Sequence, residues 1–199
     1  MWWVSCAEGI PSGRRAPRRR TYKAQFDATE KAYGVDRYIV AAIWGIESNY
    51  SIQIGDRSVL QSTATLACIG RRQAYFKEEF LSALEILNRG DLRTEQMHGS
   101  WAGAFGPTQF MPTSFKRFAV DHDGDGRRDV VDSVPDVIAS TANNLKKDGW
   151  VTGQTWGYEV VVPKGRLRTP VAVQRFMNVR IILPTTPDLF FPYHTGLLY

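Results

Sequence analysis

The segment "VDRYIVAAIWGIESNYS" (residues 35–51) combines an apolar helical stripe with one carboxylate that falls on that stripe. Asp36 is placed to cap a helix N-terminus, and apolar residues then recur at the three- and four-residue spacing of one helix face. Glu47 follows Val40 by seven positions and Ile43 by four, so it lies on the same face. Ionised carboxylates are rarely buried without a partner. The position therefore predicts either a helix end at the surface or a carboxylic acid kept in an apolar wall for a purpose.

Further helices are predicted on both sides of this segment. Helical spacing runs over residues 21–34, where a glycine ends the pattern, and again over 72–90 and 133–150. In the last of these, Ser133 and Asp136 resemble a capping box. The residues expected to face inward on the 72–90 helix are Tyr75, Phe76, Phe80, Leu84 and Leu87.

The remaining segments lack helical spacing. Residues 99–114 hold too many Gly and Pro for one regular element, which indicates a loop with short helical turns. From Thr155 a β-branched run favours a strand. The sequence therefore predicts a mainly α fold with three parts: a disordered Arg-rich tail at 1–20, a helical domain at 21–154 and a small β-containing segment at 155–199.

Composition excludes several function classes. The formal net charge is +5, but the five arginines of "RRAPRRR" (residues 14–20) account for all of it, so no nucleic-acid partner is expected. Cys68 stands in an apolar context that predicts a buried free thiol, and a disulfide with Cys6 is not expected. No apolar run reaches membrane-spanning length, and the first residues show no signal peptide. We expect a monomer.

The stretch "DHDGDGRRDVVD" (residues 121–132) has the spacing of a calcium-binding loop. Acidic residues fill loop positions 1, 3, 5, 9 and 12, and Gly126 at position 6 permits the sharp turn. Without a cation these carboxylates would repel each other, which disfavours the alternative of a merely solvated acidic turn. Position 12 is Asp where Glu is usual, and no second loop occurs, so we expect a structural ion. The predicted ligands are Asp121, Asp123, Asp125, Asp132 and the backbone carbonyl of Arg127.

Several long motifs together resemble one family. "YGVDRYIVAAIWGIESNYS", "GRRQAY", "GSWAGAFGPTQFMPTSFKRFAVDHDGDG" and "STANNLKKDGW" are similar, in this order, to the membrane-bound lytic transglycosylase B family of peptidoglycan-cleaving enzymes. The resemblance covers roughly residues 22–162. It implies a lysozyme-like transglycosylase core with a single EF-hand-like calcium loop, peptidoglycan glycan strands as partner, and a periplasmic or cell-envelope location.

The resemblance also implies roles for individual residues. Glu47 matches the family's single catalytic glutamate, which protonates the glycosidic oxygen and then takes the proton from the muramoyl 6-hydroxyl, giving a 1,6-anhydromuramoyl end. A carboxylic acid in an apolar wall suits this chemistry independently, because burial holds its proton on. For Phe110 and Tyr75, core packing is the alternative to sugar stacking. The residues that match substrate-groove positions are Arg71, Arg72, Tyr75, Ser100, Gln109 and Phe110.

The match weakens after about Gly165. The family ends its core with an adjacent Tyr-Asn pair that faces the catalytic glutamate, whereas Thr185 and Thr186 stand at that place here. Residues 155–199 are therefore a divergent or truncated segment. This leaves two alternatives to an active lytic transglycosylase: a catalytically impaired peptidoglycan-binding remnant, and a muramidase that hydrolyses the glycan with water.

Overall fold

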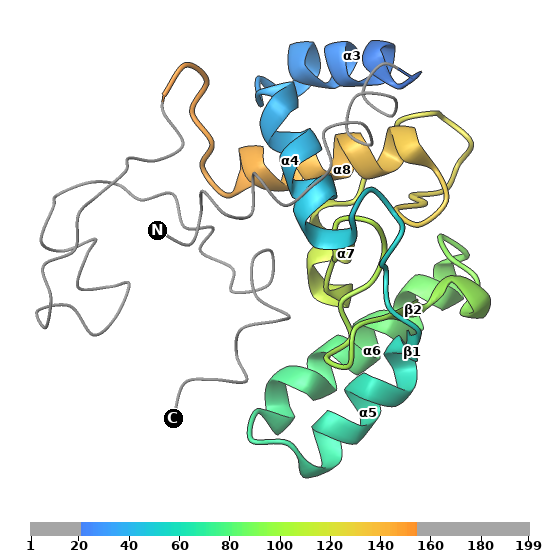
Figure 1. The fold of residues 1–199 in the computed structure, drawn as a ribbon. Helices are drawn as coiled ribbons and strands as arrows, with labels where there is room; N and C mark the ends of the chain where they lie inside the picture. The colour runs from blue at the N-terminus through green and yellow to red at the C-terminus, as the bar shows by residue number, and fades with distance from the viewer. Residues whose placement is uncertain (1–20, 155–199) are drawn as a thin grey trace, which may run out of the picture.

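The computed structural model describes residues 21–154, and the tail expected at 1–20 and the segment expected at 155–199 lie outside these residues. Two short strands, β1 (Arg57–Ser58) and β2 (His98–Gly99), pair antiparallel, with Arg57 opposite Gly99. The described part of the chain is mainly α, as predicted (Figure 1). Its helices are α3 (Lys23–Tyr33), α4 (Arg37–Ser48), α5 (Val59–Ile69), α6 (Gln73–Arg89), the 3-10 turn η1 (Thr94–Gln96), α7 (Pro112–Phe118) and α8 (Val134–Lys147).

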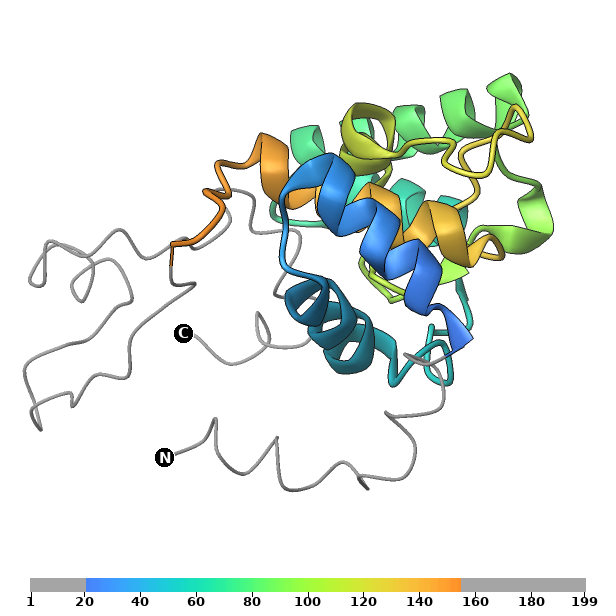
Figure 2. The same cartoon turned by 90° about the horizontal axis from the view of Figure 1, so that it is seen from above.

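The helices pack around two groups of buried side chains. In the first, helix α3 runs alongside α8 and α4 packs against both, as Figures 1 and 2 show. None of the described helices is long and apolar enough to cross a membrane. We call the first group the Trp44 cluster: Phe26, Val35, Val40, Ala41, Ile43, Trp44, Tyr50, Ile138, Ala142 and Leu145. The second, the Phe105 cluster, is Val59, Ala83, Ile86, Leu92, Met97, Phe105, Phe110, Phe115, Phe118, Ala119, Val130 and Val137.

Helix ends follow the capping signals of the sequence. Gly34 ends α3 with φ 70°, and Gly90 ends α6 with φ 77°, a backbone region that glycine adopts without steric penalty. The Asp36 carboxylate accepts a hydrogen bond of 2.6 Å from the backbone N–H of Tyr38 and so caps α4. These residues set where α4 begins, and α4 carries Glu47.

The inner face of α6 differs from the prediction. Leu84, expected to point inward, is 41% exposed. Helix α6 packs through Ile86 and Leu87 and also through small and polar side chains. Glu79, which is fully buried, accepts hydrogen bonds from the backbone N–H and hydroxyl of Thr113 at the start of α7. This polar contact shifts the buried face away from the largest apolar residues. The fully buried positions of α6 are Glu79, Ser82, Ala83 and Ile86.

The environment of Cys68 was also predicted incorrectly. Its side chain is a free thiol, but it is exposed. Helix α5 packs mainly on α6 and buries only Val59 and Thr63, so the apolar residues around Cys68 stay at the surface of the hairpin. An apolar sequence context does not distinguish a peripheral helix from a central one.

The predicted loop over residues 99–114 is held in shape by backbone contacts. Phe105 and Phe110 exchange two backbone hydrogen bonds of 2.9 Å, and the N–H of Ser100 donates to the carbonyl of Ala104 at 2.7 Å. A Cβ at Gly99 would lie 1.9 Å from that same carbonyl oxygen, so only glycine fits there. The loop therefore holds Ser100 in a fixed place beside strand β2.

Candidate active site

Glu47 lies in the last turn of α4, on the helix face that also carries the buried Val40 and Ile43. Only 9% of the residue is exposed. Burial raises the pKa of Glu47 from 4.5 to about 7. Within residues 21–154 no hydrogen bond or ion pair with another side chain offsets this effect. The carboxyl group can therefore both carry and release a proton near neutral pH.

The segment after α4 connects Glu47 to the Ser100 loop. It first reverses direction, with the carbonyl of Ser48 accepting hydrogen bonds from the backbone of residues 52 and 53. It then passes Gly99 so closely that a Cβ at Gly55 would lie 2.3 Å from the Gly99 carbonyl oxygen. At the preceding residue, the carbonyl of Ile54 accepts a hydrogen bond of 3.1 Å from the Gln109 side-chain amide. The end of α4 and the 99–111 loop are thus joined by direct contacts.

Ser100 and Gln109 are both buried at this junction. The Ser100 hydroxyl accepts a hydrogen bond from the backbone N–H of Ala104. Gln109 has φ 53°, unusual for a residue other than glycine, and its Nε2 also donates to the carbonyl of Gly106. Its Oε1 is buried and, among the described residues, has no hydrogen-bond partner. Both side chains hold the loop in shape, and each retains polar capacity that a ligand could use.

The other predicted groove residues have different surroundings from these two. Phe110 is 1% exposed and belongs to the Phe105 cluster, so it occupies a core position. Arg71, Arg72 and Tyr75 lie at the start of α6, at the tip of the α5–α6 hairpin in the lower part of Figure 1. There the Arg72 guanidinium lies 4.0 Å from the centre of the Tyr75 ring. The two arginines are exposed and Tyr75 is half-buried.

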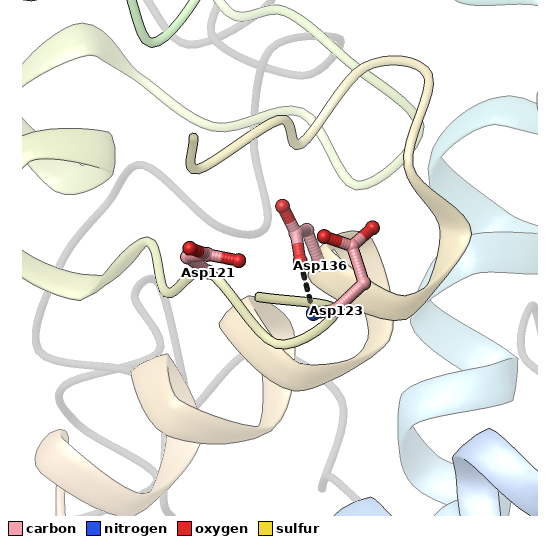
Figure 3. Close-up of side chains that lie close together, drawn as sticks. All are labelled: Asp121, Asp123 and Asp136. Atoms are coloured by element: carbon pink, nitrogen blue, oxygen red, sulfur yellow. Dashed lines mark hydrogen bonds between the residues drawn. The ribbon is translucent and has the colours of Figure 1, made fainter. Parts of the chain in front are cut away.

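The acidic loop brings three carboxylates together, as Figure 3 shows. They belong to Asp121, Asp123 and Asp136, and one oxygen of each lies within 4.8 Å of the others. Asp136 is fully buried at the start of α8 and accepts backbone hydrogen bonds from His122 and Asp129. Burial raises the pKa of Asp136, and the charge of Asp123 adds to that shift. Three hard oxygen donors around one point suit a cation such as Ca²⁺.

The three-carboxylate group differs from the ligand set that loop spacing predicted, and that set stays a prediction. Asp132, expected at loop position 12, instead accepts a hydrogen bond of 2.7 Å from Gln96 Nε2 and lies 4.0 Å from Arg93. Asp125 is exposed and accepts from the backbone N–H of Arg127, and neither residue is part of the three-carboxylate group. Asp136, in the first turn of α8, completes the three-carboxylate group, and Asp132 does not belong to it. The sequence showed Asp136 only as a helix-capping residue.

Comparisons with known proteins identify the family of this chain. Residues 7–178 match the family described as Transglycosylase SLT domain. Over 133 residues the chain is 37% identical to Membrane-bound lytic murein transglycosylase B of Escherichia coli (strain K12), which covers 66% of this chain and 37% of that protein. The chain therefore spans well under half the length of this curated relative.

Two solved structures extend the comparison to the fold. SltB3 from Pseudomonas aeruginosa, in complex with NAG-anhNAM-pentapeptide, is similar with a TM-score of 0.74 and 41% identity, over 88% of this chain and 50% of that one. The Escherichia coli lytic transglycosylase Slt35, in complex with calcium, is similar with a TM-score of 0.71 and 32% identity, over 77% of this chain and 50% of that one. The resemblance inferred from the sequence motifs is confirmed, and the chain belongs to the transglycosylase SLT domain family.

Proposed function

We propose that this chain is a lytic transglycosylase that cleaves the β-1,4 bond between MurNAc and GlcNAc in peptidoglycan, with Glu47 as its acid and base. The observation that carries the proposal is the buried carboxyl of Glu47, which has no side-chain partner among residues 21–154 and whose pKa is raised to about 7 by burial. A catalytic acid works best when its pKa lies near the working pH. The similarity to SltB3, solved with an anhydro-sugar peptide, supports the same product class.

The reaction needs one carboxyl group that changes role between its two steps. Glu47 donates its proton to the glycosidic oxygen as the bond from that oxygen to the MurNAc anomeric carbon breaks. The resulting carboxylate then takes the proton of the MurNAc 6-hydroxyl as the oxygen of that hydroxyl bonds to the anomeric carbon. The products are a new GlcNAc hydroxyl end and a 1,6-anhydroMurNAc end, and Glu47 is protonated again.

The other buried carboxylates support a mechanism with a single acid. Glycosidases that use water need a second carboxylate as nucleophile or base. Among residues 21–154, Glu79 is hydrogen-bonded to Thr113, and Asp91 is paired with Arg128. The remaining two buried acids, Asp129 and Asp136, are held by side-chain and backbone hydrogen bonds near the acidic loop. None of these four is available as a partner for Glu47.

The test is digestion of purified peptidoglycan by the wild type, with mass analysis of the products. A lytic transglycosylase gives muropeptides about 18 mass units lighter than hydrolysed ones, because the 6-hydroxyl replaces water. Glu47→Gln should lower turnover by about 10²–10⁴-fold, while glycan binding persists. Binding without turnover in the wild type would instead indicate a binding remnant.

Asp56→Asn serves as the matched control. Asp56 follows Glu47 by nine positions and its side chain is 98% exposed, so its substitution tests whether an exposed carboxylate near Glu47 in the sequence serves a hydrolytic muramidase. Under the proposal, Asp56→Asn keeps full turnover and anhydro products. Loss of turnover in this variant, together with reducing-end products in the wild type, would contradict the proposal and favour hydrolysis.

We also propose a structural Ca²⁺ held by Asp121, Asp123 and Asp136, and action as a monomer in the cell envelope. The carboxylate group of Figure 3 and the similarity to Slt35, solved with calcium, support the metal. The name of the Escherichia coli relative supports the envelope location. Asp136 lies in the first turn of α8, and Asp121 and Asp123 lie in the loop before it. None of the three is on α4, so the ion would stabilise the fold and take no part in proton transfer.

A further inference from the structure

The three residues after α4 form a strained turn. Asn49, Tyr50 and Ser51 have φ of 49°, 58° and 70°, all in the left-handed region. Asn tolerates this region, but for other L-residues a close approach of Cβ to the following carbonyl disfavours it, and left-handed residues normally occur singly. Such strain persists only where surrounding contacts hold it, and it is concentrated at functional sites. Here it begins two residues after Glu47.

The Tyr50 ring is the first of the contacts that hold the turn. It lies against Gly45 so closely that a Cβ there would be 2.9 Å from both its Cζ and its hydroxyl oxygen. It also meets the Trp44 ring edge-on, with the ring centres 5.8 Å apart, and only 9% of Tyr50 is exposed. Gly45 costs helix stability relative to alanine, and the space that it leaves is occupied by this ring.

Hydrogen bonds from the same turn hold the other neighbours of Glu47. The Trp44 indole N–H donates to the Ser51 hydroxyl at 2.9 Å. The backbone N–H of Ser51 donates to the Ser48 hydroxyl at 2.9 Å, and that hydroxyl donates to the Trp44 carbonyl at 3.3 Å. The backbone N–H of Tyr50 donates to the Trp44 carbonyl at 3.3 Å. Trp44 before Glu47 and Ser48 after it are therefore held in place by residues 50 and 51.

We propose that Tyr50 is a positioning residue for Glu47: seated on Gly45, its ring keeps the left-handed turn closed over the end of α4 and holds the carboxyl in one direction, away from water. The inference rests on the proposed role of Glu47. Helix ends otherwise fray, and an acid that moves by about 1 Å can lose about 10²-fold in rate. The strain in residues 49–51 is maintained by the same contacts that keep α4 helical up to Glu47.

The test is a double-mutant cycle on the pair Gly45 and Tyr50. Gly45→Ala adds a methyl group where the Tyr50 ring lies, so turnover should fall by about 10- to 100-fold with little change in glycan affinity. In the Tyr50→Ala background the same methyl group meets no ring. There, Gly45→Ala should lower turnover no further and should raise the melting temperature, because alanine favours the helix. Tyr50→Phe keeps the ring and most of the turnover.

The pH profile separates positioning from mere packing. The alkaline limb of the turnover profile should follow the pKa of Glu47, which burial raises. Tyr50→Ala admits water, so this limb should move to lower pH. Among the rings that contact Trp44, those of Tyr22 and Tyr50 are titratable. Tyr50→Ala adds no ionisable group, so it places no new charge near Glu47. If Tyr50→Ala does not fold, Gly45→Ala and Tyr50→Phe still decide the question.

Ile46→Ala is the matched control, because Ile46 adjoins Glu47 on α4 but is 57% exposed. It should leave turnover and pH profile unchanged. The inference is overturned if Gly45→Ala keeps wild-type turnover, or if Tyr50→Ala lowers only the melting temperature with an unshifted profile. Full turnover in Glu47→Gln would overturn the proposed function instead, so the two failures are distinguishable.

Discussion

Replacing Glu47 with glutamine should stabilise the protein above pH 5 even as it removes most of the turnover. Burial raises the pKa of Glu47 from 4.5 to about 7, so the folded chain binds this proton more tightly than the unfolded chain does. The wild type therefore loses stability as the pH rises from about 4.5 to about 7, and it loses no more above that range. Glutamine cannot ionise, so the variant escapes this loss.

The size of the effect follows from the pKa change. A rise from 4.5 to about 7 corresponds to about 3 kcal/mol of unfolding free energy. The stability of Glu47→Gln relative to the wild type should therefore change little near pH 4, by about 1 kcal/mol at pH 5, and by about 3 kcal/mol at pH 7 and above. At about 3–4 °C per kcal/mol for a domain of this size, the melting temperatures should separate by roughly 10 °C.

The assay is thermal unfolding followed by circular dichroism between pH 4 and pH 8, at one calcium concentration. Subtracting the wild type removes titrations that both proteins share. The exposed Glu78 on α6 gives a control, since Glu78→Gln makes the same substitution away from the buried site. If the Glu47→Gln difference were the same at pH 4 and pH 8, Glu47 would not be a buried acid with a raised pKa.

The acidic loop gives the next prediction: a chelator should lower the melting temperature and calcium should restore it, because the ion binds only the folded state. Asp136→Asn should abolish this response and Asp132→Asn should preserve it. The reverse result would favour the ligand set predicted from the spacing of residues 121–132, which includes Asp132. Arg128→Ala should destabilise the protein in chemical denaturation, by less than the about 3–5 kcal/mol of a fully orphaned buried charge, because the Asp91 side chain, 7% exposed, would keep only the more exposed Arg89, 3.3 Å away, as its partner. Burial raises the pKa of Asp91, but the hydrogen bonds and charge of Arg128 outweigh it and hold that pKa below its usual value, so the stability difference should shrink in acid. Gly99→Ala should unfold or misplace the Ser100 loop, because the added Cβ would lie 1.9 Å from the Ala104 carbonyl, and retention of full stability and turnover would show that the loop can yield.

Local signals in the sequence predicted the helix ends and the buried face of α4. Asp36 and Gly34 act through their own backbone neighbours, so their effect is visible without tertiary structure. Glu47 was predicted on the buried stripe by helical spacing alone, and it is 9% exposed. Where packing is dense on one side of a helix, spacing is a sufficient guide.

Predictions that depended on how helices meet were weaker. Leu84 and Cys68 are exposed because α5 and α6 form a peripheral hairpin, which no pattern within either helix reveals. That Asp136 and not Asp132 lies beside Asp121 and Asp123 depends on how the chain around the acidic loop folds, which spacing alone does not determine. Phe110 shows the same limit: its motif indicated a groove position or the core, and only the fold places it in the core.

The hydrogen bonds from the Trp150 indole and the Thr152 hydroxyl to the Gly34 carbonyl span 116 and 118 residues of sequence. The Trp44 cluster likewise needs α8, which is synthesised long after α3 and α4. At about 5–20 residues per second, a nascent chain waits about 5–20 s between the emergence of Glu47 and that of Trp150. During this interval Trp44 and Phe26 lack the α8 side chains that pack against them. A holdase chaperone would bind these exposed apolar side chains. The side chains of α8 pack against the helix that carries Glu47 only when this last helix of the described domain docks.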